Sequence, residues 1–203
     1  MEVSKNLIIP LFPLNAVLFP GGALPLKIFE PRYLDMVSDC MKKESGIGVV
    51  MIKSGNEAGI AAQTHEVGTI SHISYWHKRN DGMLGITLTG KQRFRVLSTE
   101  IKPNQLITAE IEILPDYDLS DMDKIKKQHE EQQLVNLLKQ IIAQLEPPFT
   151  TMTKKYNDME WVSARLIELL PLRLADKQEL LTIINLNDRL RYLYPLLVSM
   201  ELI

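Results

Sequence analysis

The sequence predicts an α+β fold in two parts, a small β-barrel over residues 1–116 and a bundle of α-helices over residues 117–203. Two observations predict this division. The first part is rich in glycine, proline and β-branched residues, arranged as short apolar runs between turn residues, which is typical of strands. The second part is rich in Leu, Lys, Gln and Glu, with apolar residues three or four positions apart, which is typical of amphipathic helices.

The barrel part contains seven short segments with the character of strands. They are residues 7–11, 24–28, 48–52, 67–76, 83–89, 94–101 and 106–114. Between the fourth and fifth segments, Asn80, Asp81 and Gly82 form the tip of a predicted hairpin, because an Asp-Gly pair supplies the positive φ of a tight turn.

One helix is expected to interrupt the strands, over residues 31–43. Its first residue is a proline, which suits a first helical turn because the backbone N–H there needs no partner. Helical spacing places a mainly apolar set of side chains on one side. The set is Tyr33 or Leu34, Val37, Cys40 and Met41. On that side Cys40 is expected to be a buried small hydrophobe and not a reactive thiol.

The second part is expected to contain four helices. The first covers residues 124–145 and stops before two consecutive prolines, which lack a donor and clash with the preceding turn. Asp158 is placed to cap the second helix, a short third helix lies near residues 176–183, and Asn187 is expected to open the last. The second and last helices are expected to turn these residues inward: Val162, Leu166, Leu169 and Leu170, then Leu190, Leu193, Leu197 and Met200.

Composition limits the partners and the compartment. Lys and Arg number 23 and Asp and Glu number 25, so the net charge of −2 gives no reason to expect a nucleic acid or an anionic membrane as a partner. A single cysteine forms no internal disulfide, prolines at 10 and 13 interrupt any secretory segment, and no apolar run is long enough to span a bilayer. We expect a soluble, cytoplasmic protein.

Three blocks of the sequence stand out in order along the chain: IIPLFPLNAVLFPGGALPLKIFEPRYLDMV at 8–37, VGTISHI at 67–73 and GITLTGKQRFRVL at 85–97. Together they resemble the substrate-recognition domain of Lon-type proteases. The helical part is similar more loosely, through WVSARLIELLPL at 161–172 and NDRL at 187–190. The form IFEPRY at 28–33 is closer to free-standing members of this family, and to the Lon-like domains of cereblon and of RING ubiquitin ligases.

The resemblance implies a PUA-like pseudo-β-barrel followed by a helical bundle. It also implies a non-catalytic module that binds unfolded or degron-bearing proteins or peptides, as an adaptor or holdase, with a protease or chaperone as a further partner. We expect a monomer or a weak dimer.

Residues for ATP, protease or metal chemistry are not apparent in the sequence. No phosphate-binding loop is present, because Gly90 and Lys91 are followed by Gln92 in place of serine or threonine. The Ser-Lys pair of Lon proteases belongs to a region downstream of the resembling one. His72 and His77 differ by an odd number, so on one strand they face opposite ways and make a poor metal site. We therefore expect no enzyme activity, no cofactor and no metal.

Two neighbouring segments carry the candidate peptide-binding residues. The loop at 16–25 contains paired glycines and two prolines, so its apolar residues are expected to be exposed. The IFEPRY segment either lines a groove, or uses Glu30 and Arg32 as a pair or helix cap while its aromatic residues pack on the barrel. A client would bind to this apolar surface, with strand addition at a barrel edge as an additional mode. The candidates are Val17, Leu18, Phe19, Pro20, Phe29, Glu30, Arg32 and Tyr33.

An alternative hypothesis is RNA binding, because PUA-like folds often bind RNA. Lys91, Arg93 and Arg95 alternate along a predicted strand, which would put their charges on one face and Phe94 on the other. The simpler interpretation is a solvated face neutralised by nearby glutamates.

Overall fold

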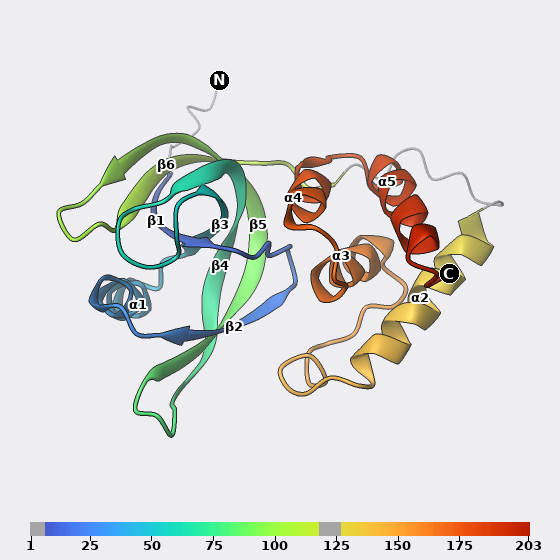
Figure 1. Ribbon diagram of the computed structural model, residues 1–203, viewed down its shortest axis with the longest axis horizontal. Helices are drawn as coiled ribbons and strands as arrows, with labels where there is room; N and C mark the ends of the chain where they lie inside the picture. The colour runs from blue at the N-terminus through green and yellow to red at the C-terminus, as the bar shows by residue number, and fades with distance from the viewer. Residues whose placement is uncertain (1–6, 118–126) are drawn as a thin grey trace. The chain divides into compact units, whose positions relative to one another are not determined.

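The first of two units, Met1–Leu114, contains six strands and one helix within its described residues (Figure 1). The second unit is Pro115–Ile203. The structure is a computed structural model that describes residues 7–117 and 127–203. The elements of the first unit are β1 (Leu7–Leu14), β2 (Ala23–Ile28), α1 (Pro31–Lys43), β3 (Ile47–Ser54), β4 (Gln63–Lys78), β5 (Leu84–Ile101) and β6 (Ile107–Ile113).

Five of the strands close into a barrel. They follow the order β5-β4-β3-β1-β6, and the ring closes because β5 pairs with β6 as well as with β4. The β1–β3 pair is parallel and the others are antiparallel, while β2 adds to β5 outside the ring. The α+β fold with a PUA-like barrel is therefore confirmed.

The strand β5 corrects the sequence prediction, which divided it into two strands at 83–89 and 94–101. It is continuous, and it carries a bulge where Ser71 pairs with Gly90 but Ile70 pairs with Gln92. The loop before β2 approaches closely here: Gly90 donates to the carbonyl of Gly22 at 2.9 Å, and a Cβ on Gly90 would lie 2.3 Å from the Phe19 oxygen. The glycine thus marks a close backbone approach at a bulge and not the end of a strand.

Phe94 fills the barrel at the point where the ring closes. It pairs with Gly68 on β4 and with Ile113 on β6, and its ring is fully buried. Gly48 and Gly68 leave room for the ring, since a Cβ on either would lie 2.9 Å from Phe94 Cζ. This contact gives a physical reason for glycine in the VGT block.

Replacing Gly68 with alanine is expected to lower the free energy of unfolding of the first unit by about 1–3 kcal/mol, the range of overpacked cores. The added Cβ would lie 2.4 Å from the backbone oxygen of Val49, which has little freedom to move. Urea unfolding followed by circular dichroism measures the change. Ser98→Ala, at an exposed position on β5, is the control and should change stability by less than about 0.5 kcal/mol.

The helix α1 has the predicted bounds, and its packing settles which side chains face the barrel. Tyr33 is buried and Leu34 is not, while Met41 is exposed, so its predicted inward position is wrong. Glu30 occupies the N-cap position without a side-chain capping bond. At the predicted hairpin between β4 and β5, Gly82 has the expected positive φ, at 80°.

The second unit is helical in its described residues. Its elements are α2 (Lys127–Ile142), α3 (Met159–Leu169), α4 (Leu174–Thr182) and α5 (Leu186–Ser199). Residues 124–126 of the predicted first helix lie outside the described residues. Asp158 caps α3 as predicted, by accepting from the backbone N–H of Trp161 at 3.2 Å. Asn185 caps α5, so the prediction that Asn187 opens this helix is wrong by two residues.

The interior of the helical unit contains an arginine that the apolar pattern did not predict. Arg189 on α5 is fully buried, and its Nη2 donates to the Glu160 carbonyl and to Ser163 Oγ on α3, each at 2.8 Å. Its guanidinium lies 4.1 Å from the centre of the Tyr117 ring. Arg189 thus ties α5 to α3 and to the segment that contains Tyr117.

Candidate functional site

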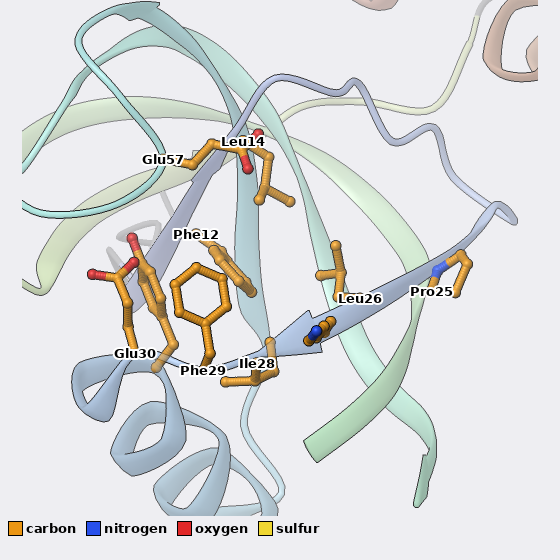
Figure 2. A pocket seen from close by; sticks show the side chains of 10 residues that line it. Phe12, Leu14, Pro25, Leu26, Ile28, Phe29, Glu30 and Glu57 are labelled. Atoms are coloured by element: carbon orange, nitrogen blue, oxygen red, sulfur yellow. The ribbon is translucent and has the colours of Figure 1, made fainter. Parts of the chain in front are cut away.

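A small apolar pocket in the first unit lies between β1 and β2, two strands that do not pair with each other (Figure 2). Its volume is about 210 Å³, below the roughly 300–1,000 Å³ of typical small-molecule sites. The size suits one inserted side chain. We call it the β1–β2 pocket; it is lined by Phe12, Leu14, Pro25, Leu26, Lys27, Ile28, Phe29, Glu30, Tyr33 and Glu57.

The interior of the pocket is aromatic and aliphatic. Phe12 from β1 stacks on Tyr33 from α1, with ring centroids 4.3 Å apart. Both rings are buried, as are Leu14 and Ile28. Phe29 differs, because 59% of it is exposed although it lines the pocket. The pocket therefore combines a fixed apolar interior with an aromatic side chain that is available for contact.

One wall of the pocket is the loop between β3 and β4, and buried Arg32 holds it. The guanidinium pairs with Glu30 at 3.0 Å and donates to the carbonyls of Gln105 at 2.9 Å and Glu57 at 3.3 Å. Glu30 also accepts from the backbone N–H of Gly59 at 3.2 Å. The charged residues of IFEPRY therefore position the loop that carries Glu57.

Burial and the charged groups around the pocket shift the pKa of the Tyr33 phenol. Burial raises the pKa of the Tyr33 phenol above its usual value; Arg32 opposes this shift, while the carboxylates of Glu30 and Glu57 add to it. The phenol consequently stays neutral at physiological pH.

The free edge of β2 is poorly suited to strand addition. Pro25 lacks a backbone N–H and Lys27 is charged, and both features protect edge strands from pairing with another chain. Lys27 also pairs with Asp81 at 3.0 Å. We therefore expect a ligand to insert side chains here and not to extend the sheet.

The structure brings together only some of the predicted peptide-binding residues. Phe29, Glu30 and Tyr33 line the pocket, and Arg32 supports its wall. Sequence reasoning missed Phe12, Leu14, Leu26 and Glu57. The first two follow Leu11, where the predicted first strand ends although β1 continues to Leu14, and Glu57 lies in a loop with no local signal.

The predicted exposure of the loop at 16–25 is wrong for its apolar residues. Val17, Leu18 and Phe19 are only 8%, 3% and 0% exposed, and Pro20 is half-buried. The loop packs on the barrel, where the Leu18 carbonyl accepts from Thr69 Oγ1 at 2.5 Å. Turn residues mark an irregular segment, but they do not decide whether it is buried.

The cationic face proposed for RNA is also corrected. Lys91 and Arg95 are exposed, but Arg93 is only 2% exposed. Arg95 lies 3.7 Å from Glu112. Phe94 points into the core as predicted. The alternation along a strand fixes on which face of the sheet each side chain lies, but it does not show whether other segments cover that face. Because Arg93 is covered, the three charges do not form one exposed face.

Thiol and metal chemistry have little support in the described residues, 7–117 and 127–203. Burial raises the pKa of the Cys40 thiol, and its side chain is buried as predicted. Within those ranges no three His, Cys, Asp or Glu side chains are grouped to hold a metal ion. No helix in those ranges is long and apolar enough to cross a membrane.

Comparison with known proteins gives consistent matches. A family model described as the ATP-dependent protease La (LON) substrate-binding domain matches residues 8–199. The Lon protease of Parabacteroides distasonis is 31% identical over 191 residues, which are 89% of this chain and 22% of that protein. The Lon protease of Escherichia coli is 25% identical over 202 residues, which are 98% of this chain and 25% of that protein. The chain thus spans about a quarter of the length of these relatives.

Solved structures agree with the family match. The crystal structure of a Lon N-terminal domain protein from Xanthomonas campestris has a TM-score of 0.73 and 32% identity, covering 93% of this chain and 98% of that one. The N-terminal domain of a Mycobacterium avium complex Lon protease has a TM-score of 0.67 at 15% identity, covering 91% of this chain and 94% of that one. The second likeness concerns the fold alone.

Proposed function

Because the chain belongs to the Lon substrate-binding domain family, we propose that it is a non-catalytic recognition module that takes apolar side chains of unfolded or degron-bearing polypeptides into the β1–β2 pocket. The single observation that carries this proposal is the apolar pocket beside exposed Phe29. An unfolded chain exposes the side chains that such a pocket accepts.

The size of the pocket supports weak, sequence-tolerant capture. Burying one large apolar side chain contributes about 1.5–3 kcal/mol, which by itself gives a dissociation constant in the millimolar range or weaker. A client with several apolar residues, each of which can enter the pocket in turn, would have a longer residence time on the protein. Such binding suits an adaptor or holdase that passes a client to a protease or chaperone.

The probe is a labelled peptide with one phenylalanine in a Gly-Ser background. Replacing Phe29 with alanine is expected to raise the dissociation constant of this peptide about fivefold, because roughly 1 kcal/mol of apolar contact is lost. Phe29 is exposed, so the fold should be kept. Fluorescence anisotropy measures the affinity, and a peptide with alanine in place of phenylalanine gives the background.

The matched control is Leu97→Ala, which removes an exposed apolar side chain from β5, away from the pocket lining. It should leave the affinity unchanged. Equal affinities of the phenylalanine and alanine peptides for the unmodified protein would refute the proposed function. Equal losses in both variants would refute the role of the pocket.

A further inference from the structure

The charged groups around the β1–β2 pocket do not balance. Glu30 is paired with Arg32 at 3.0 Å, and Lys27 is paired with Asp81 at 3.0 Å. Glu57 is exposed, and no Lys or Arg among the described residues of the first unit, 7–114, forms an ion pair with it. Of the two carboxylates in the lining, Glu57 is therefore the one without a cationic partner.

The Glu57 carboxylate is held in place while remaining open to a ligand. Its Oε1 accepts from the backbone N–H of Asn15 at 2.6 Å, and its backbone carbonyl accepts from Arg32 at 3.3 Å. Within residues 7–114, no group donates to its other oxygen, Oε2. A carboxylate fixed in this way needs little reordering to receive a cation, which reduces the entropic cost of forming an ion pair.

Lys27 does not offset this charge at the pocket. Its ammonium group is directed to Asp81 at the tip of the β4–β5 hairpin, where a backbone hydrogen bond from Met83 and the bond from Lys27 lower the pKa of the Asp81 carboxyl to about 2. The Asp81 carboxylate also pairs with Arg79 at 3.3 Å, so the Lys27 ammonium group is directed to this hairpin tip and not to Glu57.

We infer that the β1–β2 pocket selects polypeptide segments in which a Lys or Arg neighbours the apolar residue that enters it, with Glu57 as the specificity-determining carboxylate. This inference rests on the proposed function, since it specifies the client that the same pocket takes. The apolar side chain supplies contact area, and the neighbouring cation meets Glu57 at the mouth. Complementary charge of this kind sets preference among ligands more than total affinity.

The test uses three labelled peptides with the same central phenylalanine, flanked by serine, lysine or glutamate. At low salt the lysine peptide should bind about threefold more tightly than the serine peptide and the glutamate peptide about threefold more weakly, the size expected of one exposed ion pair. Added salt should reduce both differences, because exposed charges are screened.

Glu57→Gln should abolish most of the difference in affinity between the lysine and glutamate peptides, while its amide oxygen can still accept from the backbone N–H of Asn15. Glu112→Gln is the matched control: it changes the net charge equally, but on β6, outside the pocket lining, and should keep the preference.

The outcomes separate this inference from the proposed function. If the three peptides bind equally well, or if Glu57→Gln keeps the preference, the inference is wrong while the recognition role stands. If no phenylalanine peptide binds above the alanine background, the proposed function itself fails.

Discussion

Phe94→Ala is expected to lower the free energy of unfolding of the barrel unit by about 3–5 kcal/mol. The ring is fully buried and packs against the space above Gly48 and Gly68, which have no side chains to fill the cavity that alanine would leave. Phe94 also lies on the β5 segment that joins β4 to β6. Since whole domains are stable by only about 5–15 kcal/mol, this loss should open the barrel measurably.

Hydrogen exchange followed by mass spectrometry measures this effect for the barrel separately, because peptides from β4, β5 and β6 report on the barrel alone. Leu97→Ala, on the same strand but exposed, is the control and should change exchange little. If Phe94→Ala lowers the free energy of unfolding of the barrel by less than about 1 kcal/mol, the assignment of this ring to a rigid core is contradicted.

Arg189→Met is expected to destabilise the helical unit by about 3 kcal/mol. Methionine keeps most of the aliphatic stem but removes the donors that satisfy the Glu160 carbonyl and Ser163 Oγ. Hydrogen bonds to a charged group contribute about 1.5–3 kcal/mol each, and the contact with the Tyr117 ring is also lost. The change should appear as a lower urea midpoint.

Trp161 provides the signal for this measurement. It is buried in α3, and the other tryptophan, Trp76, lies exposed on β4, so a Trp76→Phe background leaves one reporter in the helical unit. Arg191→Met is the matched control on the same helix, since Arg191 is exposed and pairs with Asp188 at 3.3 Å. It should cost less than about 1 kcal/mol. Similar midpoints for the two variants would show that Arg189 has no special structural role.

Much of the fold could be predicted from local signals. The bounds of α1, the turn at Gly82 and the cap at Asp158 depend on residues within one or two turns of each other, and all three predictions are confirmed. The division of β5 was wrong because Gly90 carries the same local signal at a turn and at a bulge. Only its approach to the Phe19 carbonyl distinguishes the two.

The candidate site was predicted in part, and the errors have a common cause. Phe29, Glu30 and Tyr33 were found because they lie in one short motif, IFEPRY. Their partners Phe12 and Glu57 come from segments that are distant in sequence, so no spacing rule relates them to the motif.

The sequence by itself determined the family, the α+β class and the local elements, because these depend on periodicity, turn chemistry and ordered motif blocks. Only the tertiary structure decided which surfaces are available. It buried Phe19 and Arg93, which sequence placed outside, and it joined Phe12, Tyr33 and Glu57 around one pocket. The physical reason is that burial and charge balance depend on which segments pack together, and that packing involves contacts between residues far apart along the chain.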